Sequence, residues 1–255
     1  MRAPGAPHAF AATAGAAAHV LVGPGLAEAL RIEGPDGHHL ERVRRLRVGE
    51  RVTAGDGAGA WRPYRIVATA RGRLDLAADG VECHEPRLTP GLGVAFGIGK
   101  GTKPEQVVAG LTELGVDRIV PLASARSVAR WEPDRADAAL ARLRRVAREA
   151  AMQCRRARVP EVAAPVAPAD LAPAGTVVLG DPDGVAVDAL PEPGDAGWLA
   201  VVGAEGGWDA DERAVLLARP DAGALAVGPH VLRTETAALA VAAALAGRRR
   251  PSGAS

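Results

Sequence analysis

The stretch that decides the expected fold runs from Trp198 to Gly247 and reads WLAVVGAEGGWDADERAVLLARPDAGALAVGPHVLRTETAALAVAAALAG. It contains two short apolar runs, Trp198–Val202 and Ala224–Val227, and each leads through a glycine-bearing loop into a helical pattern. Short apolar runs bounded by turn residues are typical of strands buried in a parallel sheet. Two such units in succession place two sets of backbone amides at the carboxyl ends of neighbouring strands, where a ligand can approach them.

The loop after the first of these strands, Gly203–Gly207, is rich in glycine and leads into a helix. Asp209 followed by Glu212 predicts a helix N-cap with a capping box. Thr234 is expected to cap the alanine-rich second helix, which should end near Gly247. Two ordinary strand-to-helix turns would explain the same residues, and the glycine spacing differs from the GxGxxG of dinucleotide sites.

Strand and helix patterns alternate through the rest of residues 86–255, which predicts an α/β domain with a mostly parallel sheet. A proline at the first turn favours a helix start, and a glycine after the last apolar position favours a helix end. The expected elements are strands at Gly91–Ile98, Arg118–Pro121 and Thr176–Gly180, and helices at Pro104–Leu114 and Asp134–Arg158.

Residues 1–85 predict a small β domain made of short strands. Asp56-Gly57 and Arg71-Gly72 have the composition of hairpin turns, and His84–Pro90 is expected to link this domain to the next. The expected strands are Glu50–Ala54, Trp61–Ala70 and Leu74–Ala77.

The composition allows two domains, because 48% of the 255 residues are hydrophobic and can form sizeable cores. The net charge of +1 hides an asymmetry. Residues 100–160 carry 13 basic and 7 acidic side chains, whereas residues 161–255 carry 6 basic and 13 acidic ones. A chain that is nearly neutral as a whole can therefore present a basic face to a polyanion.

The sequence favours a cytoplasmic protein without a metal site or a membrane span. Cys83 and Cys154 are far apart and have no metal-ligand spacing, which indicates reduced thiols. The alanine-rich run Ala9–Val22 is interrupted by Gly15 and His19, so we do not interpret it as a signal peptide. No other run approaches the length of a membrane span.

The order of GAEGGW and VGPHVLRTETAAL resembles the closing signature of the RsmE-type family of the SPOUT superfamily. ELGVDRIVPL, SARS, EAAMQCRRARVPEV and HHLERVRRLRVGERV resemble further family blocks, in the family's order, and the likeness extends from about His38 to Leu245. It implies an enzyme that methylates N3 of a uridine in small-subunit (16S) ribosomal RNA with S-adenosylmethionine. It also implies a PUA-like β-barrel at 1–85, a SPOUT-type α/β domain with a C-terminal trefoil knot at 86–255, and a homodimer.

The resemblance assigns the cofactor to three loops that follow strands of the second domain. Arg233 is the candidate that stabilises negative charge on the uridine carbonyl oxygens when the imide proton leaves. Glu205 would face the sulfonium or the amino group of the cofactor, or accept the proton. The candidate cofactor-binding residues are Leu179, Gly180, Gly203, Glu205, Gly206, Gly207, Val227, Gly228, Val231, Leu232, Thr234 and Thr236. For Arg233 the alternative is a structural pair with Glu205 or Glu235, and for the two threonines it is helix capping.

Arginine-rich segments are the candidates for contact with ribosomal RNA or the small subunit. His38–Arg47 is predicted to form an amphipathic helix with Leu40, Val43 and Leu46 on its apolar stripe, and the long helix at Asp134–Arg158 carries a second set of arginines. Ordinary solvated faces would explain both sets. The candidate RNA-binding residues are Arg42, Arg44, Arg45, Lys100, Lys103, Arg126, Arg144, Arg145, Arg148, Gln153 and Arg156.

The chain departs from the family pattern at three places. Ala204 stands where the family usually has proline, Ala125 replaces a usual acidic residue, and Pro7–Phe10 lacks an arginine common near the start. Two alternatives to the uridine reaction stay open: methylation of another RNA position, and a non-catalytic RNA-binding factor in ribosome assembly. An NAD-linked oxidoreductase is disfavoured, because no strand is followed by GxGxxG.

Overall fold

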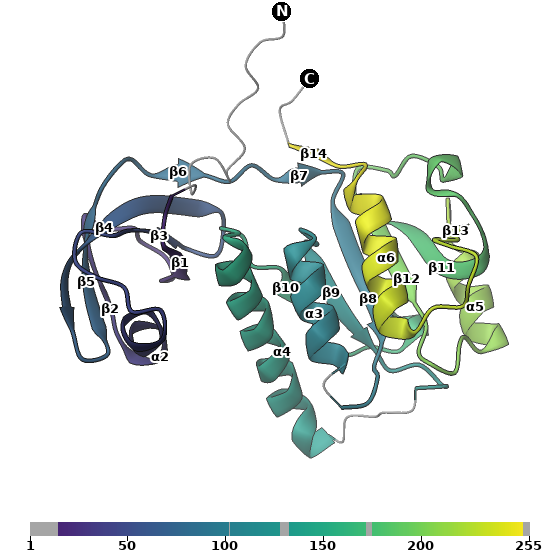
Figure 1. Ribbon diagram of the computed structural model, residues 1–255. Coiled ribbons are helices and arrows are strands. Elements are labelled where there is room, and N and C mark those ends of the chain that lie inside the picture. Colours follow the sequence, from purple (N-terminus) through teal and green to yellow (C-terminus); the bar gives the residue numbers. More distant parts are fainter. Residues whose placement is uncertain (1–14, 102, 128–132, 172–174, 252–255) are drawn as a thin grey trace, which may run out of the picture. The chain divides into compact units, whose positions relative to one another are not determined.

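The computed structural model describes residues 15–101, 103–127, 133–171 and 175–251 (Figure 1). The Pro7–Phe10 segment, which lacks the arginine common in the family, lies outside these residues. The chain divides into two compact units. Unit 1 comprises Met1–Pro86 with Ala151–Val159, and unit 2 comprises Arg87–Ala150 with Pro160–Ser255.

Unit 1 contains a six-stranded sheet in which the order is β1-β3-β4-β5-β2 and β6 pairs with β4. The three predicted strands are present as β3, β4 and β5. No end of these strands differs from its predicted position by more than one residue. β4 and β5 pair antiparallel around the predicted turn, where Gly72 has a φ of +70°. The strands are β1 Ala18–Leu21, β2 Ala29–Ile32, β3 Arg51–Gly55, β4 Ala60–Ala70, β5 Arg73–Ala78 and β6 Cys83–His84.

Alternate side chains of β4 and β5 form the centre of the unit 1 core. Tyr64, Ile66, Leu74 and Leu76 are at most 2% exposed, which is the period of two expected of a strand with one buried face. The Tyr64 hydroxyl donates to the Ala27 carbonyl oxygen at 2.8 Å, so its polar end is satisfied at the edge of the core.

The helix predicted at His38–Arg47 is wrong in its position and length. A short helix α2 (Gly34–His38) continues into a π-helical turn η1 (His39–Val43). Leu40 and Leu46 are buried as expected, but Val43 is 63% exposed. The wider turn rotates Val43 away from the apolar side, and Arg45 then takes a φ of +54°, which ends the helical path.

Unit 2 is built on a six-stranded sheet with the order β10-β9-β8-β12-β11-β13. Every neighbouring pair in it is parallel, as predicted. The order reverses between β8 and β12, and ligands of open parallel sheets bind beyond the carboxyl ends of the strands at such a switch point. The strands are β8 Leu92–Gly97, β9 Arg118–Leu122, β10 Glu161–Val162, β11 Thr176–Val185, β12 Trp198–Val202 and β13 Gly223–Leu225.

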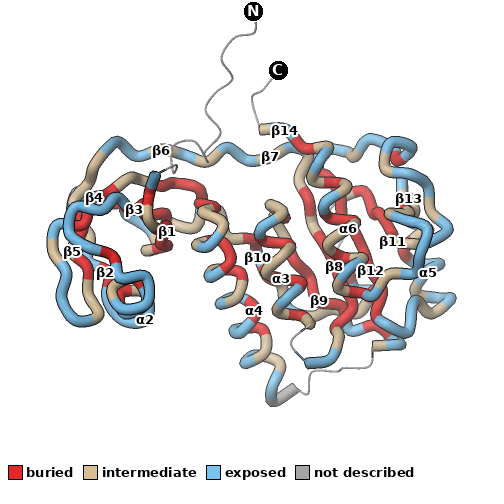
Figure 2. The backbone as a smooth tube through the Cα atoms, viewed as in Figure 1, coloured by how far each residue is buried: buried red, intermediate tan, exposed pale blue. Residues whose placement is uncertain are grey.

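Helices cover both faces of this sheet, and the strands between them are buried (Figures 1 and 2). α3 (Lys103–Glu113) and α6 (Thr234–Ala246) pack side by side on one face. They approach closely at Gly110, where a Cβ atom would lie 2.6 Å from Leu239 Cδ2. α5 (Ala210–Leu217) and the 3-10 turn η2 (Pro168–Asp170) cover the opposite face, where Leu216 joins a core cluster of strand side chains.

Helix α4 (Pro133–Cys154) ends four residues earlier than the predicted Arg158. Arg155 has a φ of +61°, its N–H donates to Met152 O at 3.3 Å, and the Arg156 N–H donates to Ala151 O at 2.8 Å. This hydrogen-bond pattern is the Schellman motif that ends many helices. Glycine usually takes the left-handed position, so an arginine there leaves little signal in the sequence.

Part of the predicted linker His84–Pro90 forms strands. β6 joins the unit 1 sheet, and β7 (Leu88–Thr89) pairs antiparallel with β14 (Arg250–Pro251) in unit 2. A further 3-10 turn, η3 (Val187–Ala189), follows β11. Within the described residues, none of the helices combines the length and the hydropathy that crossing a bilayer requires.

Candidate active site

A cavity of about 550 Å³ lies at the carboxyl ends of β12 and β13 and beside Gly180–Pro182, an irregular part of β11, near the switch point of the unit 2 sheet. This part of β11, the loops after β12 and β13, and the first turns of α6 enclose it. The sequence predicted that this strand would end at Gly180, but β11 continues to Val185 beyond the irregularity. Its walls are mainly apolar side chains and loop backbone, and its volume is in the range of small-molecule sites. It is lined by Gly180, Asp181, Pro182, Val202, Gly203, Ala204, Glu205, Gly207, Trp208, Arg213, Leu225, Val227, Gly228, His230, Val231, Leu232, Arg233, Thr234, Ala237 and Val241.

The loop after β12 is held in place at both ends. Asp209 caps α5 and Glu212 bonds back to the Asp209 N–H, so the predicted capping box is confirmed. Ala204 lies against the end of β8, because a Cβ atom at Gly97 would come within 2.5 Å of Ala204 Cα. The Thr234 hydroxyl donates to the Gly203 carbonyl oxygen at 3.0 Å. Thr234 is therefore not the helix N-cap expected from the sequence. That position is Arg233, and Thr234 instead joins α6 to the loop.

The structure brings most of the predicted cofactor residues to this cavity. Gly180, Gly203, Glu205, Gly207, Val227, Gly228, Val231, Leu232 and Thr234 line it. Three others are absent from its described lining. Leu179 is fully buried in the core, Thr236 is exposed on α6, and Gly206 packs against Arg126, where a Cβ atom would lie 3.0 Å from Arg126 Cβ. The predicted segments therefore reach this cavity, but the sequence did not predict which of their residues face into it.

Several lining residues were not among the sequence candidates. The most polar of them are Asp181 and Arg213, whose side chains form an ion pair at 3.0 Å across the cavity wall. Trp208 contributes an aromatic face next to Gly203. Asp181 directly follows the predicted strand Thr176–Gly180, so its position after a buried strand was a usable signal. The sequence contained no comparable signal for Arg213 and Trp208, because their positions at the cavity depend on how α5 packs on the sheet.

Glu205 at the cavity wall is bound by a lysine from another element. Lys103, the first residue of α3, donates a hydrogen bond to Glu205 Oε1, and its Nζ lies 3.8 Å from Glu235 Oε1. The hydrogen bond from Lys103 lowers the pKa of Glu205 and raises the pKa of Lys103. A carboxylate with a lowered pKa is a weaker proton acceptor, so this arrangement favours an electrostatic role for Glu205.

Arg233 lies at the N-terminus of α6, is exposed and lines the cavity. The sequence left open a structural pair with Glu205 or Glu235. Within the described residues neither carboxylate forms an ion pair with Arg233, and both face Lys103 instead. Its guanidinium is therefore accessible from the cavity.

The candidate RNA-contacting residues are divided between the two units. In unit 1, Arg42 lies 3.8 Å from Glu41, and Arg44 donates to the Ala17 carbonyl oxygen at 2.6 Å, yet both remain exposed together with Arg45. Gln153 is exposed. Arg156 is only 9% exposed, so little of its side chain is accessible to a ligand, and its contact with RNA stays a prediction.

In unit 2, the remaining basic candidates lie near the carboxyl edge of the sheet or on α4. Lys100 is exposed, and Arg126 donates to the Gly206 carbonyl oxygen at 3.3 Å. Arg144 donates to Val162 O at 3.1 Å, and Arg145 lies 4.0 Å from Glu149. Arg148 is half-buried. Neighbouring groups thus position part of the side chains of Arg126, Arg144 and Arg145.

Comparison with known proteins identifies the family. Residues 87–246 match the family described as RNA methyltransferase domain, and residues 32–78 match the family described as RNA methyltransferase PUA domain. A ribosomal RNA small subunit methyltransferase E from Mycobacterium bovis is 37% identical over 219 residues, which cover 81% of this chain and 82% of that relative. The chain belongs to the ribosomal RNA small subunit methyltransferase E family. A family member from Bacillus subtilis is 26% identical over 225 residues.

Solved structures of this methyltransferase family share the fold. A ribosomal RNA small subunit methyltransferase E from Neisseria gonorrhoeae, bound to S-adenosyl methionine, has a TM-score of 0.76 and 25% identity, and the match covers 89% of this chain and 96% of that chain. A protein from Thermotoga maritima described as a predicted RNA methyltransferase has a TM-score of 0.67 and 28% identity, with coverage of 91% and 98%. The expectation of a PUA domain followed by a parallel-sheet methyltransferase domain is thus confirmed.

Proposed function

We propose that this protein transfers the methyl group of S-adenosylmethionine to N3 of a specific uridine in 16S ribosomal RNA. The observation that carries the proposal is the cavity formed by Gly180–Pro182 of β11 and the loops after β12 and β13, in a chain of the methyltransferase E family. The same substrate would place the protein in the cytoplasm, where the small ribosomal subunit is assembled.

The cavity fits the cofactor in size and in chemistry. Leu225, Val227, Leu232 and Val241 provide apolar walls for a flat base, and the glycine-rich loops expose backbone groups that can recognise its polar edge. Gly228 has open space where a Cβ atom would stand, which leaves its backbone accessible. When bound, S-adenosylmethionine supplies an electrophilic methyl group. The protein has to align that group with the acceptor and exclude water.

Arg233 is the proposed catalytic residue. Uridine N3 is a good nucleophile only after its proton leaves, and the negative charge then spreads to the two flanking carbonyl oxygens. A guanidinium presents several donors in a plane and keeps its charge at any physiological pH. Arg233 at the cavity rim would donate to these oxygens and stabilise the anion.

Glu205 would act by its charge at the cavity wall. The hydrogen bond from Lys103 keeps it ionised and fixes its orientation. An ionised carboxylate stabilises a nearby cation, so the sulfonium and amino end of the cofactor is its proposed partner. Water or an RNA group would then take the imide proton.

We also propose that the protein acts as a homodimer through α6. From Ala237 to Ala246 this helix consists only of Ala, Leu and Val, whereas a helix with one solvated face carries polar residues there. Ala243 on its outer side is exposed, and Val231 on the neighbouring loop is 86% exposed. A second copy would cover these apolar groups. Ala243→Glu should then give a folded monomer in analytical ultracentrifugation, and an unchanged association state would exclude this interface.

Unit 1 and the basic face of α4 are the proposed RNA-binding parts. The exposed arginines of unit 1 and Arg144 and Arg145 of α4 would contact phosphates without reading sequence. The trefoil knot and the assignment of residues 1–85 and 86–255 to separate functions belong to the same proposal.

Calorimetric titration with S-adenosylmethionine, with NAD as control, tests the cofactor assignment. Incubation of assembled small subunits and of free 16S RNA with the labelled cofactor, followed by mass spectrometry of the digested nucleosides, tests the product. N3-methyluridine at one position is expected. Cofactor binding with a different methylated nucleoside would overturn the position, and absence of cofactor binding in the folded protein would favour a non-catalytic assembly factor.

A further inference from the structure

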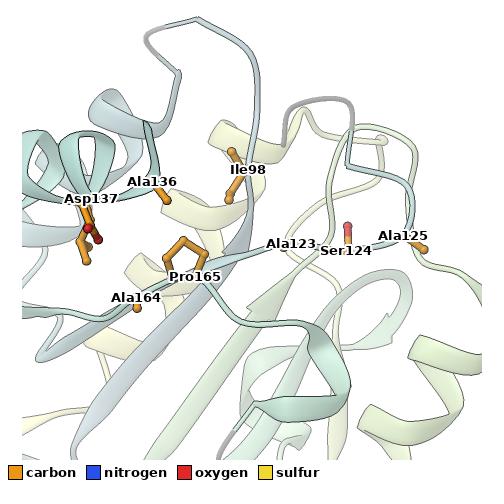
Figure 3. A pocket seen from close by; sticks show the side chains of 9 residues that line it. Ile98, Ala123, Ser124, Ala125, Ala136, Asp137, Ala164 and Pro165 are labelled. Carbon is orange, nitrogen blue, oxygen red and sulfur yellow. The ribbon is translucent and has the colours of Figure 1, made fainter. Parts of the chain in front are cut away.

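A second cavity, of about 640 Å³, lies at the other half of the carboxyl edge of the unit 2 sheet (Figure 3). Ile98 follows β8, Ala123–Ala125 follow β9, and Ala164-Pro165 follow β10, so this cavity is formed beyond three strands that do not contribute to the first one. Ala136, Asp137 and Leu140 of α4 close its side. The proposed methyl transfer involves no residue of this second cavity.

The two cavities are separated by a ridge of tightly connected loops. Gly97, next to Ile98 of the second cavity, lies against Ala204 of the first. The Ala125 N–H donates to Glu212 Oε1 at 2.7 Å, and Arg126 donates to Gly206 O at 3.3 Å. Since both cavities open beyond the carboxyl ends of one sheet, a chain lying along this edge can reach both.

The walls of the second cavity are suited to a flat, mostly apolar group that carries a hydrogen-bond donor. Ile98, Leu140 and Pro165 are its large side chains, and Figure 3 shows Asp137 on α4 and Pro165 on the segment after β10. Asp137 forms no ion pair with any other residue in the described ranges, and an ionised carboxylate only accepts hydrogen bonds. Ser124 is 2% exposed, with its hydroxyl 2.9 Å from the Ser127 hydroxyl, so it is already partnered.

The charges around the cavity favour a base at one position and a phosphate at another. Asp137 and Arg144 are seven residues apart and thus lie on the same side of α4, two turns from each other. Arg144 donates to Val162 O at 3.1 Å, two residues before Ala164 of the cavity wall. A nucleic-acid backbone would lie over the arginine, because the carboxylate repels phosphate, and only a base would turn towards Asp137.

We propose that this second cavity binds an unstacked nucleobase with an exocyclic amino group, from the same RNA but distinct from the target uridine. The amino group would donate to the Asp137 carboxylate, as cytosine N4 does to acidic side chains. Uracil is disfavoured, because its single imide donor is flanked by two carbonyl oxygens that would face the carboxylate. The inference rests on the proposed function, because it takes RNA as the substrate. It assigns to Asp137 the selection of the RNA sequence or conformation near the target uridine.

Isoleucine methyl NMR tests this proposal directly, because the chain has only four isoleucines, at positions 32, 66, 98 and 119. Ile98 reports on the second cavity, Ile119 is buried in β9 of the same sheet, and the other two belong to unit 1. Protein labelled at isoleucine δ1-methyl groups and saturated with S-adenosylmethionine is titrated with CMP, AMP, GMP and UMP. The Ile98 methyl signal is expected to shift saturably with at least one amino-bearing nucleotide and not with UMP.

Asp137→Ala should weaken this nucleotide binding about tenfold or more, the loss expected when a hydrogen bond to a charged acceptor is removed. Asp188→Asn, an exposed change elsewhere in unit 2, is the control and should leave it unaltered. An Ile98 signal that stays unmoved by all four nucleotides, or one that responds equally to UMP and to Asp137→Ala protein, would overturn the proposal. Failure of N3-uridine methylation with a normal Ile98 response would instead refute the proposed reaction and leave this site standing.

Discussion

Arg249 and Asp117 form an ion pair between a buried guanidinium and a partly exposed carboxylate, which joins the segment after α6 to the start of β9. The Arg249 side chain has no exposed surface, and besides Asp117 it donates to Pro90 O at 2.8 Å, Gly115 O at 2.7 Å and Leu88 O at 3.1 Å. Asp117 also accepts the Leu92 N–H at 3.0 Å. One guanidinium from the last part of unit 2 therefore satisfies three carbonyl groups in its first part.

Arg249→Ala should destabilise unit 2 by about 2–4 kcal/mol, because it leaves three carbonyl groups without the Arg249 donors and removes the ion pair to the partly exposed Asp117. Urea unfolding followed by circular dichroism measures the change. Arg250→Ala, at an exposed neighbouring position, is the control and should change stability by less than about 0.5 kcal/mol. Equal losses of stability in the two variants would show that the ion pair between Arg249 and Asp117 and the carbonyl contacts of Arg249 add no specific stability.

Gly97→Ala should weaken S-adenosylmethionine binding by displacing the loop after β12. A Cβ atom at Gly97 would lie 2.5 Å from Ala204 Cα, a backbone atom that cannot move away without shifting the loop. Gly91→Ala is the matched control, since its Cβ atom would lie at an ordinary 3.5 Å from Ala196 O. Calorimetry should give a dissociation constant raised about tenfold or more for the first variant only. Normal affinity in a folded Gly97→Ala protein would mean that the loop position does not control the cofactor site.

Lys103→Met should raise the pKa of Glu205, because the hydrogen bond and charge of Lys103 are what lower it. Glu205 would then take up a proton at a higher pH than in the unchanged protein, and the acid limb of methyl transfer should move upwards. Carboxyl carbon-13 NMR of labelled glutamate measures the titration of Glu205 directly. Lys100→Met is the control, because Lys100 makes only a smaller contribution to the same pKa. If Glu205 titrates at the same pH in all three proteins, the pair does not persist in solution.

His19 should make unit 1 sensitive to mild acid. Burial lowers its pKa from 6.5 to about 4, with a further contribution from the charge of Arg155. Between these two pH values the unfolded chain binds a proton that the folded chain does not, so stability is complete above about pH 6.5 and falls as the pH decreases towards 4. The loss at pH 4.5 should be about 2 kcal/mol relative to pH 7.

Urea titrations of His19→Gln measure this contribution, because glutamine can still bond to Thr53 but does not titrate. The variant should lose less stability than the unchanged protein over the same pH interval. Parallel curves for the two proteins would assign the acid sensitivity to other groups.

Arg233→Ala should lower kcat for methyl transfer by about 10²–10³-fold, the range seen when one donor to a developing anion is removed. The dissociation constant for S-adenosylmethionine should stay within about threefold, because the backbone groups of the loops remain in place. Arg233→Lys keeps the charge but loses the planar donors and should recover only part of the rate. A normal kcat in Arg233→Ala would remove this residue from the mechanism.

The sequence predicted those features of the fold that depend on neighbours along the chain. β12 occurs at the predicted bounds Trp198–Val202, and Asp209 with Glu212 forms the predicted capping box. At two places where the expected bounds were wrong, a residue of unfavourable type took an unusual conformation. Arg45 and Arg155 have positive φ angles that are more typical of glycine. The predicted extent of the helix at His38–Arg47 and the predicted end of α4 were wrong for this reason.

The candidate site shows the same division. The segment at Gly180 and the loops after β12 and β13 could be identified from glycines at the ends of apolar runs, and the family resemblance named the cofactor that they would bind. The inward orientation of Asp181 and Arg213, and the outward packing of Gly206 on Arg126, could not be identified in this way. These depend on how α5 and the loop after β9 pack on the sheet.

The amino-acid sequence by itself determined the family, the alternation of strands and helices in the second half, and the glycine-bearing segments that line the first cavity. Hydrophobic period, turn residues and capping residues act over a few positions, so they can be interpreted from local sequence. Only the tertiary structure decided that Lys103 holds Glu205, 102 residues away, and that a second cavity with Asp137 lies beyond β8, β9 and β10. The order of strands in a sheet sets which distant side chains meet, and no local pattern contains that order.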